Sequence, residues 1–425
     1  MSQLTSTSRA VPVHGGLAAP VDRIVPKNAA TAARWSSLPR IDVDETDRTT
    51  LYRIADGTLS PLVGPMGRED HDRVLEEGAI ERGGRRFAWT IPVVLPVTDA
   101  EAALVARSKE LALFHAGAPF GWIEIEQAFP WNKAEFVRSV YGTERTDHPG
   151  ARLWLDDPRT NLVAGSIGLF PFEDRRPFAR RVLGPRETRE LVARRGFEQT
   201  IAFQTRNPLH RAHEYALVYG AEKLLRGSGK RTGVVLNPLV GQLKGDDVPA
   251  DVRMRTYEAL VEGRFLGLGD LDEALWSRCG QDLNDQLELI GLDMRMYYGG
   301  PREAVMHAIY RQNLGFSHFI VGRKHADAPY DDRTPIWGDF DAQEIFGSLG
   351  GELGIRTVNV GFAAYFEEIG RVGLVEDNKG RTQVTISGTR MRELLDRGEM
   401  PDERVMRPST AKVLAQYYGS QRKDA

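Results

Sequence analysis

The segment FQTRNPLHRAHEY, residues 203–215, decides the fold because it leads from a short apolar strand directly into a helix. The residue pattern predicts the strand over 200–203 and the helix over 209–225. Pro208 has a fixed φ suited to the first turn of a helix, so we expect the helix to start there. The free N–H groups and the positive dipole end of this helix would then face the end of the strand and attract anions.

The residues that follow continue the alternation of strands and helices. An apolar run precedes a helix, a strand is expected at DMRMYYG, and a further helix leads to the strand HFIVG. Strands and helices alternating at this spacing predict an α/β fold, with a parallel sheet covered by helices on both faces. Ligands of such sheets bind beyond the carboxyl ends of the strands. The apolar run spans residues 233–240, the two helices span 252–262 and 302–314, and the two expected strands span 293–299 and 318–322.

The preceding part of the chain, residues 51–167, reads as short strands and turns. DGTLSPLVGPMG is dense in Gly and Pro, RRFAWTIPVVLPV is rich in branched and aromatic residues, and GWIEIEQAF alternates between apolar and polar residues. This pattern indicates a β-rich domain. The charged run at 173–195 has helical composition and predicts a connecting helix pair.

Composition excludes several classes of protein. The chain has 425 residues, 41% hydrophobic and 27% charged, which is typical of a folded chain of two or three domains. The 56 basic and 59 acidic residues give a net charge of −3, so we expect no nucleic-acid partner. No apolar run is long enough to span a membrane, and the single cysteine, Cys279, fits a cytoplasmic location.

The first 45 residues are rich in Ala, Ser, Thr and Arg. This mix is also found in transit peptides, but a flexible or subunit-wrapping arm is the favoured interpretation.

Arg206, His210 and His213 form the strongest chemical cluster. The two histidines are three residues apart and share one face of the expected helix, and Arg206 immediately precedes it as a fixed cation. A zinc site lacks a third ligand, and two packed histidines would be the ordinary interpretation of HxxH alone. Together with the helix terminus, the cluster indicates a receptacle for phosphate-type oxygens.

The same segment resembles the QTRNPxHRAHE signature of the ATP sulfurylase family, a relative of the HxGH nucleotidyltransferases. NPLVGQLKGDDV, YYGGPREAVMHAIYRQNLGFSHFIVGRKHAD and ISGTRMRELL are similar to three further motifs of that family. LSPLVGPMGREDHDRVLEE and TIPVVLPV look like its PUA-like amino-terminal domain. The resemblance implies a Rossmann-like, HxGH-type catalytic domain preceded by a β-rich PUA-like domain.

From these observations we divide the chain into four parts. They are a flexible N-terminal arm (1–45), a PUA-like domain with connecting helices (46–195), an adenylyltransferase catalytic domain (196–360), and a C-terminal segment with the ISGT motif and a helical tail (361–425).

The resemblance implies transfer of the adenylyl group of ATP to sulfate, which gives adenylyl sulfate and pyrophosphate. Sulfate is fully ionised and needs no general base, so the site must supply positive charge and alignment. Mg²⁺ would accompany ATP without ligands from protein side chains, and a homo-oligomer is expected. The resemblance assigns sulfate binding to Gln204, Arg206, Arg323 and Ala326; catalysis to Arg206, Asn207, His210, His213 and Arg323; and ATP binding to Gln204, Thr205, Asn207, His210, His213, Lys244, Gly322, His325, Ser387, Thr389 and Arg392.

Three residues depart from the family pattern. Lys324 stands where the family usually has Asp, Asp327 where it has Gly, and Asn237 where it has His. These changes leave a second hypothesis open, in which the acceptor is another oxyanion or a small phosphorylated or phosphonate compound. A third hypothesis is a nucleotide-binding pseudoenzyme, against which the intact cluster at 204–213 argues.

Overall fold

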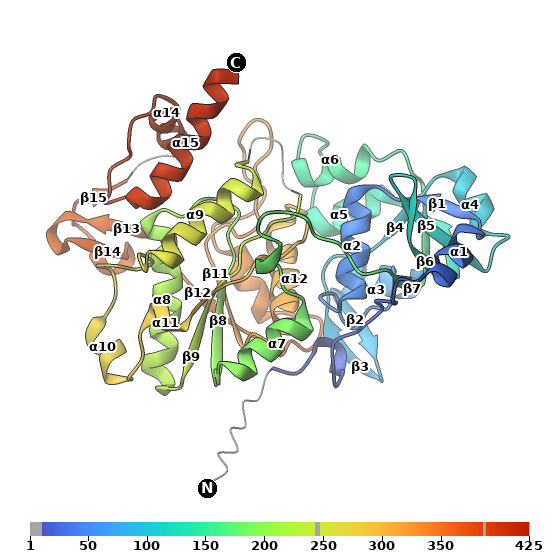
Figure 1. Ribbon diagram of the computed structural model, residues 1–425, viewed down its shortest axis with the longest axis horizontal. Helices are drawn as coiled ribbons and strands as arrows, with labels where there is room; N and C mark the ends of the chain where they lie inside the picture. Colours follow the sequence, from blue (N-terminus) through green and yellow to red (C-terminus); the bar gives the residue numbers. More distant parts are fainter. Residues whose placement is uncertain (1–10, 243–246, 386–387, 425) are drawn as a thin grey trace, which may run out of the picture.

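The computed structural model describes residues 11–242, 247–385 and 388–424. An N-terminal domain with a mixed sheet, a central domain built on a parallel sheet and a C-terminal segment follow one another across the molecule (Figure 1). No helix among the described residues is both long enough and apolar enough to cross a membrane.

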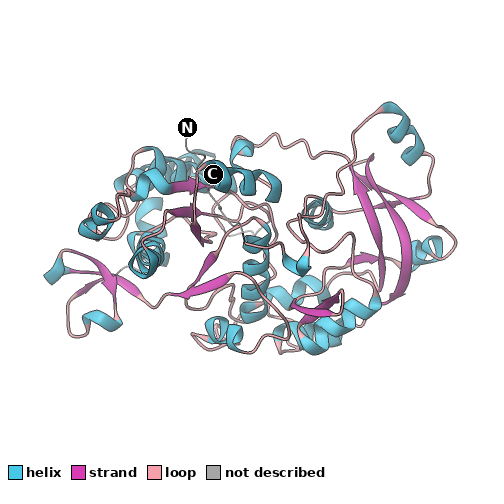
Figure 2. Cartoon of the chain, turned by 90° about the horizontal axis from the view of Figure 1, so that it is seen from below, coloured by secondary structure: helices cyan, strands magenta, loops and turns pink. Residues whose placement is uncertain are grey.

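The N-terminal domain is built on a five-stranded sheet in the order β1-β5-β6-β7-β4, seen in Figure 2 as the larger group of strands. The alternation in GWIEIEQAF buries Ile123 and exposes Glu124, as expected for a strand with one face on a core. The elements of this domain are η1 (His14–Gly16), α1 (Ala29–Ser36), β1 (Arg40–Asp42), α2 (Glu45–Ala55), α3 (Arg68–Glu77), β2 (Ala79–Arg82), β3 (Arg85–Ala88), β4 (Leu95–Val97), α4 (Asp99–Val105), β5 (Glu110–His115), β6 (Ala118–Pro130), α5 (Lys133–Tyr141), α6 (Pro149–Leu155) and β7 (Asn161–Leu169).

Residues 11–45 belong to this domain, so the prediction of a flexible arm is wrong for them. β1 pairs in parallel with β5, and Trp35 of α1 is fully buried, with its ring 4.0 Å from that of Phe170. Burial of large apolar side chains offsets the entropy lost when such a segment becomes ordered. Residues 1–10 of the predicted arm lie outside the described residues.

The central domain contains a parallel sheet in the order β10-β9-β8-β11-β12, which confirms the predicted α/β class. Every residue of β9 is buried, as expected for a strand in a sheet covered on both faces. The strands are β8 (Gln199–Phe203), β9 (Thr232–Leu236), β10 (Leu287–Leu289), β11 (His318–Val321) and β12 (Arg356–Asn359); the helices are α8 (Arg211–Ser228), α9 (Ala250–Glu262), α10 (Glu273–Arg278), α11 (Leu283–Gln286), α12 (Gly300–Asn313) and α13 (Asp341–Glu344), and η3 (Ile345–Gly347) follows.

The strand predicted at DMRMYYG is wrong. Residues 293–299 form a buried irregular segment, and the strand beside β9 is β10, earlier in the chain. The N–H groups of Tyr297 and Gly299 donate to the carboxylate of Glu303, at 2.8 and 2.9 Å, instead of to a neighbouring strand. A side chain thus satisfies the backbone where a sheet ladder was expected.

The predicted connecting helix pair is one α-helix and a short turn. The turn is η2 (Ala179–Arg181), and the helix is α7 (Pro185–Arg194), which starts at a proline after Gly184. The residues before this turn follow an irregular path and form three ion pairs, which are Arg175–Glu173, Arg176–Asp174 and Arg176–Asp293.

The C-terminal segment packs against α8 and α9. Met391 and Leu395 of α14 and Leu414 of α15 form an apolar cluster with Val252 of α9. The segment therefore covers the helices that follow β8 and β9 (Figure 1). Its elements are β13 (Ala363–Phe366), η4 (Glu367–Ile369), β14 (Arg371–Leu374), η5 (Glu376–Asn378), β15 (Gln383–Val384), α14 (Gly388–Asp396) and α15 (Pro408–Asp424).

Candidate active site

A cavity of about 620 Å³ lies beyond the carboxyl ends of β8 and β11. This is the edge where ligands of parallel sheets bind. Most of the residues predicted for the site line this cavity: Gln204, Thr205, Arg206, Asn207, His210, His213, Gly322, Arg323, His325 and Ala326, joined by Lys324 and Asp327.

The helix after β8 begins at Arg211, three residues after Pro208, where its start was expected. Asn207 is held in a turn, because its N–H donates to Thr205 Oγ1 at 3.1 Å and its carbonyl accepts from the Tyr257 hydroxyl at 2.8 Å. The N–H of Arg211 donates to the carbonyl of Val405 at 2.7 Å. One of the amides expected to face an anion is therefore already satisfied, and the hydroxyl of Thr205 is used within the loop.

His210 and His213 lie together at the start of α8. Their rings stack with centroids 3.7 Å apart and an angle of 22°. Burial lowers the pKa of His210 to about 4, and burial with the neighbouring His210 lowers the pKa of His213 well below its ordinary value. Both rings are therefore neutral at pH 7, so they offer N–H donors to an anion but no charge.

Arg206 supplies the charge on this side of the cavity. Its guanidinium carbon lies 5.1 Å from the centre of the Tyr298 ring. The Nη1 atom is buried and has no hydrogen-bond partner among the described residues. A buried guanidinium N–H that the protein does not satisfy is suited to an oxyanion.

The loop after β11 supplies the opposite side. Arg323 stacks on Phe362, with its guanidinium carbon 3.8 Å from the ring centre, and Nη1 donates to Asp339 Oδ2 at 2.8 Å. Lys324 and Ala326 have φ values of 48° and 57°, in the left-handed region that non-glycine residues rarely adopt. Such backbone conformations cluster at ligand sites, where the surrounding contacts maintain them.

A buried chain of polar groups runs below the cavity. Gln204 Nε2 and His325 Nε2 lie 3.0 and 2.9 Å from His307 Nδ1, and His307 Nε2 lies 3.2 Å from Glu303 Oε1. Burial raises the pKa of Glu303 to about 7. Gln204 Oε1 is buried and has no partner among the described residues. The chain fixes Gln204 and holds His325, and both residues line the cavity.

Some predicted residues are not brought to the cavity. Arg392 is exposed on α14 and does not line it. Lys244 and Ser387 lie outside the described residues, as does the side chain of Thr389. Asn237 is fully buried under the site, where its N–H donates to the carbonyl of Phe203 at 2.8 Å. Asn237 therefore does not contact a ligand in the cavity.

The prediction missed Glu303, His307, Asp339 and Phe362. Glu303 and His307 are four residues apart in GPREAVMHA, a spacing that places them on one face of a helix and could have indicated a buried pair. The sequence around Asp339 and Phe362 holds no comparable signal, since each approaches Arg323 only through the fold.

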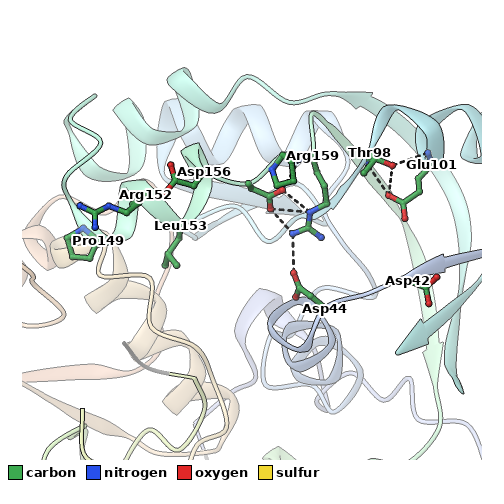
Figure 3. A pocket seen from close by; sticks show the side chains of 11 residues that line it. Asp42, Asp44, Thr98, Glu101, Pro149, Arg152, Leu153, Asp156 and Arg159 are labelled. Carbon is green, nitrogen blue, oxygen red and sulfur yellow. Dashed lines mark hydrogen bonds and ion pairs between the residues drawn. The ribbon is translucent and has the colours of Figure 1, made fainter. Parts of the chain in front are cut away.

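A second hollow, of about 710 Å³, lies in the N-terminal domain (Figure 3). Five of its eleven lining residues are acidic. The cation Arg152 pairs with Asp331 at 2.9 Å, and the other cation, Arg159, is already bound by carboxylates. Its Nη2 lies 2.6 Å from Asp157 and 3.3 Å from Asp44, and its Nη1 lies 2.6 Å from Asp47. This hollow therefore lacks the free positive charge that an anionic substrate requires.

Models of two known families match this chain. The ATP-sulfurylase family model matches residues 180–417, and a PUA-like domain model matches residues 11–171.

Several curated relatives match over most of their length. A sulfate adenylyltransferase of Pyropia yezoensis is 61% identical over 97% of this chain and 98% of the relative. A sulfate adenylyltransferase of Synechococcus sp. is 35% identical over 97% and 98%. A solved structure described as a hexameric APS kinase from Thiobacillus denitrificans has a TM-score of 0.69 at 21% identity, covering 96% of this chain and 68% of the other. That likeness concerns the fold.

Proposed function

The chain belongs to the ATP sulfurylase family, and we propose that the cavity beyond β8 and β11 is where it transfers the adenylyl group of ATP to sulfate. The products are adenylyl sulfate and pyrophosphate. The relatives described above are sulfate adenylyltransferases and match nearly the whole chain, so the reaction is that of the family.

The observation that carries the assignment of the site is the convergence of two guanidinium groups from different loops. Arg206, with its unsatisfied Nη1, and Arg323, held on Phe362, both line one cavity with Gln204. Sulfate and the triphosphate of ATP repel each other, and the barrier to attack falls when fixed cations hold both anions in line. We assign Gln204, Arg206, Arg323 and the backbone of Ala326 to sulfate.

The neutral rings of His210 and His213, with Asn207, are assigned to the phosphates. As the bond between the α-phosphorus and the bridging oxygen breaks, negative charge grows on pyrophosphate, and N–H donors already in place stabilise it without reorganisation. Since the acceptor arrives ionised, no side chain has to remove a proton from it. Lys244, Thr389, Ser387 and Arg392 stay assigned to ATP on the family resemblance alone.

Mg²⁺ fits this site as a companion of ATP. The described lining of the cavity offers cations, neutral imidazoles and the single carboxylate of Asp327. A hard cation prefers several oxygen ligands, which the triphosphate supplies. When bound, Mg²⁺ neutralises phosphate charge, and the residues named above orient the reacting groups.

Two of the three departures from the family pattern do not favour another acceptor, and the third, Asp327, lines the cavity with a negative charge, which does not favour a more anionic one. Lys324 Nζ lies 3.7 Å from Asp339 Oδ1, so its charge has a counter-ion, and Asn237 lies outside the cavity. We therefore keep sulfate as the acceptor.

The direct test is incubation of the protein with ATP, Mg²⁺ and pyrophosphatase, with and without sulfate, followed by mass analysis of the nucleotides. We expect adenylyl sulfate only when sulfate is present. ATP consumption that requires a different acceptor, or ATP binding without turnover, would contradict the proposal.

Two further proposals concern the oligomeric state and the cellular location of the enzyme. We propose a homo-oligomer, supported by the hexameric description of the structural relative and by the exposed apolar side chains of Phe265 and Leu268. Light scattering on the purified protein measures the mass of the oligomer.

We also propose a cytoplasmic location, supported by the presence of one cysteine in 425 residues. Cell fractionation tests it.

A further inference from the structure

Two consecutive cations at the rim of the cavity share one carboxylate. Asp339 Oδ2 accepts from Arg323 Nη1 at 2.8 Å, and Asp339 Oδ1 lies 3.7 Å from Lys324 Nζ. The backbone joins the same residues, because the N–H of Lys324 donates to the carbonyl of Asp339 at 2.9 Å. Asp339 is thus fixed beside both cations, although the chain reaches it 15 residues after Lys324.

The balance of charge around the cavity depends on this residue. Among the described lining residues, Arg206, Arg323 and Lys324 are cations, and Asp327 is the carboxylate. Asp339, which pairs with Arg323 and Lys324, adds a second carboxylate next to the lining. The five groups together carry one net positive charge, whereas without Asp339 the sum would be two.

We propose that Asp339 is a specificity-determining residue: as the shared counter-ion of Arg323 and Lys324 it sets the net charge of the cavity, and with it the preference of the site for a small dianion over a monoanion. The proposal rests on the function given above, because it assumes that sulfate binds beside Arg323. It explains how the chain accommodates a lysine where the family usually has an acid.

The physical basis is that the energy between fixed charges is proportional to the product of the charges. Removal of one negative charge near the site therefore strengthens the binding of a dianion by twice the free energy gained by a monoanion of the same shape. Sulfate and perchlorate form such a pair, since both are tetrahedral oxyanions and carry two charges and one charge. If the affinity for sulfate rises about tenfold in a partly screened site, that for perchlorate rises about threefold, the square root.

The experiment measures the KM for sulfate and the inhibition constant of perchlorate against sulfate, at low ionic strength and again at 0.5 M of an inert salt such as potassium acetate. The variants are Asp339→Asn, Lys324→Ala and the double variant. Asp331→Asn is the matched control, since Asp331 is an exposed carboxylate paired with Arg152 and does not line the cavity.

We expect Asp339→Asn to lower both constants in the ratio given above, and Lys324→Ala to raise both. The double variant restores the original net charge and should return both constants to within about twofold of the unmodified protein. The changes should shrink at 0.5 M salt. Asp331→Asn should change neither constant.

Three results would overturn the inference. If Asp339→Asn and the double variant both bind sulfate more weakly, Asp339 acts by holding Arg323 in place and not by its charge. If sulfate and perchlorate change by equal factors, the effect is steric. If no constant moves, the ion pair is only a surface contact. Failure of the proposed function is a separate result, because it would appear as a lack of sulfate-dependent turnover in the unmodified protein.

Discussion

The imidazole rings of His210 and His213 stack 3.7 Å apart at the start of α8, and both are neutral at pH 7. We expect His210→Ala and His213→Ala to lower kcat about 10- to 100-fold while the KM for ATP changes little, because hydrogen bonds of about 1.5–3 kcal/mol to a charged oxygen are lost mainly in the transition state. Steady-state kinetics checks this. A rise in KM alone would assign the histidine to ground-state binding.

The lowered pKa of His210 also predicts how stability depends on pH. The folded value is about 4 and the ordinary value is 6.5, so the unfolded chain takes up the proton first as the pH falls. Stability should therefore be lost as the pH falls from 6.5 towards 4. His210→Gln should make this loss smaller, by on the order of 1–2 kcal/mol at pH 5. Urea unfolding at pH 5 and 7 gives the comparison, and equal pH dependence in both proteins would contradict it.

Arg206 is expected to be indispensable for turnover. Arg206→Ala should reduce kcat/KM for sulfate by about 10²–10⁴, the effect of losing one or two charge-assisted hydrogen bonds of about 1.5–3 kcal/mol each. Arg206→Lys should also be severely impaired, since an ammonium does not reproduce the planar two-pronged contact. Circular dichroism controls for folding. Near-normal activity of the lysine variant would remove Arg206 from the site.

The stability contributed by Glu303 should depend on pH in the direction opposite to that of His210. At pH 5 Glu303 is a protonated carboxyl group, and each of its two oxygens accepts a backbone N–H. The amide nitrogen of a glutamine cannot accept one, so Glu303→Gln should cost about 1–3 kcal/mol at pH 5. The folded pKa is about 7 against an ordinary 4.5, so the stability contributed by the glutamate is lost as the pH rises through 7. The cost of the substitution should therefore shrink at pH 8. Denaturant unfolding at both values tests this, and a constant difference would count against the raised pKa.

The sequence predicted the parallel sheet and the cluster around Arg206 because both depend on local order. A strand that runs into a helix carries its own pattern of apolar residues, and a cation next to that junction lies near the end of the strand whatever the rest of the chain does. Long motifs such as GRKHAD could be placed for the same reason. The start of α8 was misplaced because the hydroxyl of Tyr257 and the carbonyl of Val405, both distant in sequence, determine the path of the preceding loop.

Other features depended on contacts between distant segments, which one sequence does not display. The N-terminal residues were expected to form a loose arm because chain termini are usually poorly ordered, yet Trp35 packs against Phe170. DMRMYYG has the composition of a strand, but Glu303 takes the backbone N–H groups that a sheet would use. The charge of Lys324 could be read from the sequence, whereas its ion pair with Asp339 could not. Residue type and local pattern fix which groups a chain carries, whereas only folding decides which of them meet, because electrostatic and hydrogen-bond energies depend on distance in space.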